Sequence, residues 1–159
     1  MIALVYDGTF RGFLTAVYEG FARKDPETHL CREGRNNSFL FQTATVVTDP
    51  GKCGRVENSL RQKFSQDCYH LIHTAWHCDH FDVDNKLYAF IKLSYQMKRD
   101  ISGMTQHPVV GDVLKCSRLV GRETQLYRGI LRFTKMGDVY LADVKSDHNI
   151  LPLLADHFI

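Results

Sequence analysis

The chain has 159 residues, of which 44% are hydrophobic and 24% are charged. This composition is typical of a globular domain and excludes a disordered or fibrous protein, and the formal net charge of +2 is too small to indicate nucleic-acid binding by itself. The five cysteines form no CxxC pair, and no apolar run reaches the roughly 18 residues that a membrane span needs. We therefore expect one cytoplasmic domain over residues 1–159, with free thiols.

The first third of the chain predicts two strands separated by a helix. Residues 2–6 are almost wholly apolar and end at Asp7-Gly8, which is typical of a buried strand entering a turn. From about residue 9 to residue 24, aromatic and aliphatic side chains recur at helical spacing and predict a helix whose aromatic stripe packs on a sheet. The polar residues 27–38 are interpreted as a loop, and the aromatic and β-branched residues of 39–47 predict a second strand.

The middle of the chain predicts three helices. Asp49 can accept hydrogen bonds from the free N–H groups of a first turn, and Pro50 occupies a position whose N–H would have no partner, so this pair is typical of a helix start. Further apolar stripes predict helices over residues 67–78 and 83–98. Residues 101–106 are expected to turn the chain into the next element.

The segment from His107 to Phe133 combines an apolar helical stripe with the densest positive charge. The stripe predicts an amphipathic helix and consists of Val109, Val113, Cys116 and Val120. Over residues 107–135, six Lys or Arg residues stand against two acidic residues, a net charge of +4. Five of these cations could contact the phosphates of DNA: Lys115, Arg118, Arg122, Arg128 and Arg132. The alternatives are a solvated helix face and ion pairs of Arg122 or Arg128 with Glu123.

The last part of the chain predicts a hairpin and a final helix. Residues 128–135 have a strand-like pattern, a tight turn follows at Met136-Gly137-Asp138, and residues 139–144 alternate well enough to return as the second strand. An apolar helical face begins at about residue 148 or 149, which places Pro152 in the first turn. The whole pattern predicts an α/β fold, with a small mixed sheet of about four strands covered by five or six helices and with the hairpin beside the first strand.

A histidine cluster is a candidate metal site. His70, His73 and His77 would share one face of a helix, so three imidazoles could approach one transition-metal ion. The spacing lacks the glutamate of HExxH and a second Cys or His pair, so a solvated histidine-rich face is the favoured alternative. We expect no cofactor, because the chain has no P-loop and no GxGxxG motif.

A second candidate set could carry acid–base catalysis, because His and carboxylate pairs are the usual groups for proton transfer. Its members are Asp7, Glu123, His148 and His157, with Asp147 beside them. No nucleophile motif such as GxSxG accompanies them. The alternative role for Asp147 and Asn149 is capping of the last helix.

Four motifs, in this order along the chain, resemble the bacterial family of DNA metabolism proteins, which has a domain of unknown function. They are VYDGTFRGFLTAVYEGF, VVTDP, HPVV with LVGRETQLYRGILRF, and SDHNILPLLADHF. Members of that family are typically encoded beside a radical-SAM protein assigned to DNA modification or repair, and some carry a uracil-DNA glycosylase-like domain at the C-terminus. Members usually continue past the last motif into an arginine-rich segment with tryptophan, so this chain resembles a C-terminally truncated form.

The resemblance implies an accessory role in DNA repair or modification. The matching positions are Asp7, His107, Arg122, Glu123, Arg128, Arg132, Asp147, His148 and His157, and the resemblance assigns none of them a catalytic role. The leading hypothesis is therefore a non-catalytic module that binds DNA, a radical-SAM partner, or both. The alternatives are a nucleic-acid-processing enzyme that uses the Asp, Glu and His residues, and a protein-interaction adaptor without DNA contact.

Overall fold

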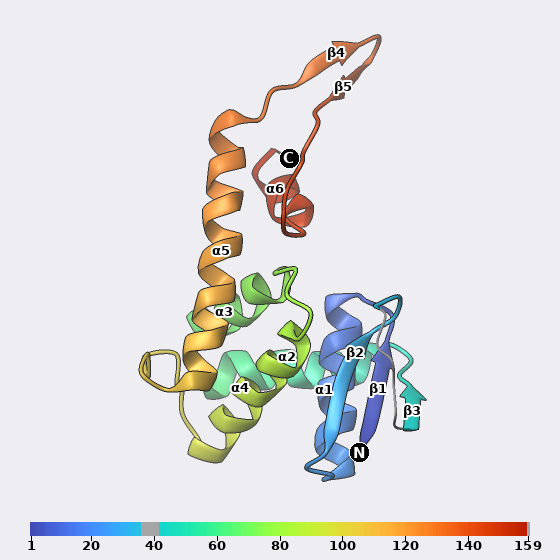
Figure 1. Ribbon diagram of the computed structural model, residues 1–159, viewed down its shortest axis with the longest axis vertical. Helices are drawn as coiled ribbons and strands as arrows, with labels where there is room; N and C mark the ends of the chain where they lie inside the picture. The colour runs from blue at the N-terminus through green and yellow to red at the C-terminus, as the bar shows by residue number, and fades with distance from the viewer. Residues whose placement is uncertain (36–41, 159) are drawn as a thin grey trace.

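The computed structural model describes residues 1–35 and 42–158 (Figure 1). Three parallel strands form a small sheet in which β1 (Ile2–Tyr6) is central, with β2 (Thr28–Arg32) on one side and β3 (Gln42–Thr45) on the other. The predicted strand at the start of the chain is confirmed as β1. Its apolar residues are explained by this central position, because a strand between two neighbours is shielded from solvent along both edges.

The interpretation of residues 27–38 as a loop is wrong for residues 28–32, which form β2. Parallel pairing with β1 brings Leu30 and Cys31 into the core, where they are 3% and 4% exposed. The polar residues around them concealed this strand, because a short edge strand needs few apolar positions. The predicted strand 39–47 is confirmed over β3, and the three residues before β3 lie outside the described residues.

Four helices confirm the predicted helices of the first two thirds of the chain. They are α1 (Phe10–Arg23), α2 (Pro50–Lys63), α3 (Gln66–Trp76) and α4 (Val83–Met97). At the start of α2, Asp49 Oδ1 accepts a hydrogen bond from the Lys52 N–H at 2.9 Å, and Pro50 occupies the first turn, as predicted. Thr9 and Ser65 cap α1 and α3 in the same way.

Helix α5 (Pro108–Ile130) is the longest described helix and packs against α3 and α4. Its buried stripe follows the predicted spacing, with Val110 in place of Val109. The prediction of a strand over residues 128–135 is confirmed only at residues 134 and 135; it is wrong for residues 131–133, which form neither helix nor strand, and for residues 128–130, which belong to α5. The helical hydrogen bonds continue beyond them, since the Leu131 N–H still donates to the Tyr127 carbonyl at 2.9 Å.

The predicted hairpin is confirmed, but its position is not the expected one. Strands β4 (Thr134–Met136) and β5 (Val139–Leu141) pair with each other around Gly137, whose φ of +64° suits a tight turn, and form a separate sheet. The expectation that this hairpin lies beside β1 is therefore wrong. Figure 1 shows it projecting from the end of α5, on the opposite side of the molecule from the parallel sheet. Helix α6 (Leu151–Phe158) begins two or three residues later than predicted, with Pro152 in its first turn.

The predicted α/β class is confirmed, with small sheets and six helices among the described residues. One connected hydrophobic core runs from the parallel sheet through α1–α4 to α5 and α6. Across the described ranges, no helix combines the length and apolar character that a bilayer span requires. The fold thus places the charged side of α5 and the apolar hairpin outside the main body.

Candidate nucleic-acid interface

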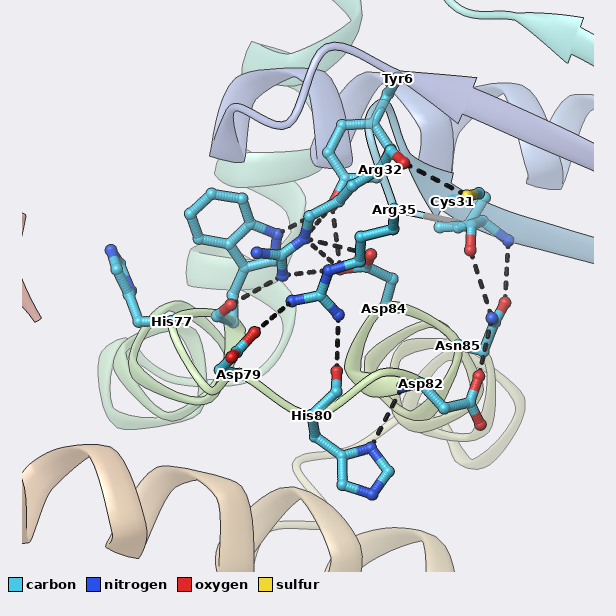
Figure 2. Close-up of polar contacts among 12 residues, drawn as sticks. Tyr6, Cys31, Arg32, Arg35, His77, Asp79, His80, Asp82, Asp84 and Asn85 are labelled. Carbon is cyan, nitrogen blue, oxygen red and sulfur yellow. Dashed lines mark hydrogen bonds and ion pairs between the residues drawn. The ribbon is translucent and has the colours of Figure 1, made fainter. Parts of the chain in front are cut away.

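A buried polar network connects the parallel sheet to α3 and α4 (Figure 2). Asp84 accepts hydrogen bonds from the Tyr6 hydroxyl at 2.9 Å and from Arg32, whose Nη2 lies 2.9 Å from Asp84 Oδ1. The side chains of Arg32 and Asp84 are only 11% and 4% exposed. The Trp76 indole N–H donates to Tyr6 Oη at 3.1 Å, and the Trp76 carbonyl accepts from Arg32 Nη2 at 2.8 Å. Hydrogen bonds from Tyr6 and to the Trp76 carbonyl thus supplement the buried ion pair, as the burial of two charges requires.

A side chain of α4 also forms hydrogen bonds with backbone groups on the free edge of β2. The Asn85 amide accepts from the Leu30 N–H at 2.8 Å and donates to the Leu30 carbonyl at 3.2 Å. Just beyond the strand, Arg35 donates to the His80 carbonyl at 2.7 Å and pairs with Asp79 at 3.1 Å. In Figure 2 both arginines reach from the β2 side toward the α3–α4 connection. Side chains from the second half of the chain thus occupy backbone groups that an edge strand otherwise leaves open.

Three of the predicted DNA-contacting cations share one exposed face of α5. Lys115, Arg118 and Arg122 lie within about 60° of one another around the helix axis, at roughly 100° per residue, and all three are exposed. The two acidic residues of segment 107–135, Asp112 and Glu123, bind other groups. Asp112 pairs with Lys86 at 3.5 Å, and Glu123 binds backbone amides. Within the described ranges, no carboxylate pairs with these three cations, which we name the α5 basic face.

Arg128 and Arg132 lie away from the α5 basic face. Arg128 is in the last turn of α5, about 120° around the helix from Arg122, and its Nη2 lies 3.4 Å from the Leu153 carbonyl of α6. Arg132 follows the helix and donates to the adjacent Leu131 carbonyl at 3.4 Å. Arg128 thus belongs to the last turn of α5 and Arg132 lies beyond the end of the helix, so the expected alignment of the two arginines on one strand is absent.

Glu123 holds the segment before α6 against the body of the protein. Its Oε1 accepts from the Asp147 N–H at 2.7 Å, and its Oε2 accepts from the His148 N–H at 3.0 Å. His148 Nδ1 in turn accepts from the Asp79 N–H at 3.0 Å, and the Asn149 N–H donates to the His77 carbonyl at 3.1 Å. We name residues 146–149 the strap. The alternative pairing of Glu123 with Arg122 or Arg128 is not made, because both carboxylate oxygens bind the strap.

The structure brings together only two of the four candidate catalytic residues. Glu123 and His148 meet at the strap. Asp7 instead binds Thr9 and Thr48 at the start of α1, and these hydrogen bonds, that from Thr48 first, lower the pKa of its carboxyl group. His157 is exposed on α6, with its ring 4.8 Å from that of Phe158. Catalysis by this set stays a prediction, and its carboxylates are occupied by structural hydrogen bonds.

The three histidines of the candidate metal site differ in their surroundings. His70 is exposed, whereas His77 is only 3% exposed and its Nδ1 lies 2.8 Å from the His73 carbonyl. The His73 ring lies edge-on to Phe10 at 4.8 Å, and burial lowers its pKa to about 4. Among residues 1–35 and 42–158, no three His, Cys, Asp or Glu side chains form a group that could hold a metal ion. His73 and His77 are thus packed, neutral groups at pH 7, and the expected solvated face holds only for His70.

Cys78 and Cys116 form a buried pair near the strap, since Cys78 lies between His77 and Asp79, whose backbone groups bind the strap. A hydrogen bond between the Cys116 and Cys78 thiols lowers the pKa of Cys78 against the opposing effect of burial. The same bond raises the pKa of Cys116. The two residues are only 2% and 4% exposed. The described residues include all five cysteines and contain no disulfide, as expected.

The comparison with family models concerns the second half of the chain, which contributes Asp84, the α5 basic face and the strap. Residues 82–159 match the family model of a domain of unknown function, DUF4130. No curated protein and no solved structure shows significant similarity to the chain. The DUF4130 segment comprises α4, α5, the hairpin and α6.

The DUF4130 segment is joined to the first half of the chain by the polar network. Asp84 and Asn85, near the start of the segment, bind Arg32 and Leu30 of β2. A spacing of 52 to 78 residues separates Asp84 from its partners Arg32 and Tyr6. A local sequence pattern cannot reveal contacts over such a distance. The position of Asp84 in the first turn of the largely apolar α4 is the signal that could have drawn attention to it.

Proposed function

We propose that the protein is a non-catalytic accessory module in DNA repair or modification that binds DNA through the α5 basic face. The observation that carries this proposal is the group of three exposed cations on one helix face without a carboxylate partner among the described residues. Exposed cations of this kind bind phosphates and release counterions. The resemblance to DNA metabolism proteins supports the same function.

The geometry of α5 favours duplex DNA as the ligand of this face. The helix has 23 residues, and its second half extends beyond α3 and α4 (Figure 1). An exposed helix of this kind can approach the backbone of a duplex along its length. Because none of the three cations pairs with a carboxylate of residues 1–35 or 42–158, each is available to one phosphate.

Salt dependence provides the test. If all three cations contact phosphates, the slope of log K against log salt concentration for duplex DNA should be about −2.7, and Arg118→Ala with Arg122→Ala should reduce it to about −0.9. Fluorescence anisotropy of a labelled duplex at several salt concentrations measures both slopes. The change should affect all DNA sequences alike, because phosphate contacts carry no base information.

A control variant removes the same charge from the same segment. Arg128→Ala with Arg132→Ala should leave the slope unchanged, because these side chains lie off the α5 basic face. An equal reduction in both double variants would contradict the assignment of the face. Wild-type binding without salt dependence would contradict the proposal as a whole.

A protein partner is a second candidate function, and the hairpin favours it. Six large apolar side chains on β4, β5 and α6 are 43–63% exposed, and a group of exposed apolar residues often marks an interaction site. They are Met136 61%, Val139 57%, Tyr140 63%, Leu141 50%, Leu151 59% and Phe158 43%. We propose that this apolar surface contacts the radical-SAM protein or the uracil-DNA glycosylase-like domain that the resemblance implies as partners.

Replacement of two hairpin residues tests this second function. Tyr140→Ser with Leu141→Ser should weaken binding to the radical-SAM protein by about tenfold or more, because exposed apolar residues at an interface centre dominate its affinity. Val47→Ser with Phe81→Ser is the matched control, since those side chains are 82% and 84% exposed elsewhere on the surface. Co-purification followed by titration calorimetry measures the difference, and equal affinity of the two variants would remove the hairpin from the interface.

A further inference from the structure

A pocket of about 490 Å³ opens between α1, α2 and α4. Its walls are mainly aromatic, with Tyr18 and Phe21 from α1 and Tyr95 from α4, and Arg55 and Ser59 of α2 add polar groups. A second pocket, of about 390 Å³, adjoins it, because Phe21 and Tyr95 line both. We name the two together the aromatic groove. Each has the volume of a small-ligand site.

The rings of the aromatic groove are held in place before any ligand binds. The Tyr95 hydroxyl donates to Ser59 Oγ at 2.6 Å, which fixes the orientation of its ring. The Phe21 ring lies edge-on to Tyr95 and Tyr88, with centroid separations of 5.4 Å and 5.8 Å. Phe21 nevertheless remains 37% exposed, so the ring pair forms a rigid, accessible aromatic wall between the two pockets.

Positive charge surrounds this wall. Arg55 lines the first pocket, Lys24 and Lys92 line the second, and Lys63 lies 5.5 Å from the Tyr95 ring centre. None of these four cations forms an ion pair with a carboxylate in the part of the chain that the structure describes. Against them stands Asp25, which lines the second pocket. The aromatic groove therefore complements a ligand that carries planar rings and several negative charges.

We propose that the aromatic groove binds single-stranded nucleic acid, with successive bases on the two sides of the Phe21–Tyr95 wall and the backbone phosphates at Arg55 and Lys92. Aromatic rings bordered by cations are the general means by which proteins bind unpaired strands without sequence preference. A duplex cannot occupy this site, because its bases are already stacked and paired. The site is separate from the α5 basic face and does not require DNA binding there.

The test uses anisotropy of a labelled oligothymidylate of about ten nucleotides, within the usual site size of such proteins. Phe21→Leu retains an apolar side chain but removes the ring, and it should weaken binding by at least about fivefold. Arg55→Gln, at an exposed position, should weaken binding and reduce its salt dependence. The matched controls are Phe81→Leu, on a ring that is 84% exposed elsewhere, and Arg11→Gln, on exposed α1 surface; both should bind as the wild type. Circular dichroism checks that every variant is folded.

Three outcomes separate the possibilities. The proposal would be overturned if both Phe21→Leu and Arg55→Gln bound oligothymidylate with wild-type affinity. It would also be overturned if these variants lost as much affinity for duplex DNA as for oligothymidylate. Displacement of the oligonucleotide by free thymidine monophosphate at equal concentration would also overturn it, in favour of a mononucleotide site. The Arg118→Ala/Arg122→Ala variant should retain oligothymidylate affinity, so failure of the α5 basic face leaves this result unaffected.

Discussion

Replacement of Asp84 by Ala is expected to lower the free energy of unfolding by about 3–5 kcal/mol, because it leaves the Arg32 guanidinium buried without its counter-charge. The Tyr6 hydroxyl loses its acceptor in the same variant. Burial, the largest cause of the raised pKa of Tyr6, persists in this variant, so the hydroxyl stays protonated and cannot replace the carboxylate. Urea denaturation followed by circular dichroism measures the loss.

An exposed pair in the same region provides the control. Asp79 pairs with Arg35 at the surface, with a side chain that is 69% exposed, so Asp79→Ala should cost less than about 1 kcal/mol. Arg32→Met combined with Asp84→Leu should recover much of the loss, because an apolar pair of similar volume leaves no buried charge. If Asp84→Ala costs no more than Asp79→Ala, the network does not join the two halves of the chain.

Replacement of Glu123 by Ala is expected to release the strap. The change removes the two hydrogen bonds that Glu123 accepts from the Asp147 and His148 amides, and because water can replace bonds at these partly exposed positions, we expect a net loss of about 2 kcal/mol, below the sum of two bonds to a charged acceptor. A local opening that becomes easier by about 2 kcal/mol is roughly 30 times more populated. Because Cys78 is only 2% exposed, its thiol should react with a soluble reagent mainly when this segment opens.

The rate of Cys78 alkylation by iodoacetamide, followed by peptide mass spectrometry, measures this opening and should rise about 10- to 100-fold. Gln125→Ala changes an exposed residue of the same helix and should leave the rate unchanged. Glu123→Gln retains one acceptor oxygen and should give an intermediate rate. An unchanged rate in Glu123→Ala would show that the strap is held by its other contacts alone.

The helices were predictable because their causes are local. The Asp49 cap, the Pro50 start and the apolar stripe of α5 depend on residues at most one or two turns apart, and the structure has them as predicted. The error in the predicted end of α5 also has a local cause. At Arg128 to Ile130 a strand-like alternation competed with helix continuation, and the helix continues because its hydrogen bonds extend to Leu131.

The candidate sites were predictable only in part. The spacing of Lys115, Arg118 and Arg122 placed them on one helix face, because helical periodicity alone determines that arrangement. The aromatic stripe of α1 was expected to pack on the sheet, and Phe13 and Val17 are buried as expected. Phe21 is exposed instead, since α2 and α4 lie against this end of α1 and leave a groove there.

The sequence by itself determined the α/β class, the helices and the one-sided charge of α5, since periodicity, capping and charge spacing act over a few residues. Only the tertiary structure decided that polar residues 28–32 form a strand, that the hairpin stands apart from the parallel sheet, and that Asp84 meets Arg32 and Tyr6. The physical reason is that strand pairing and buried ion pairs derive their stability from partners distant in sequence. Those partners come together only when the whole chain is folded.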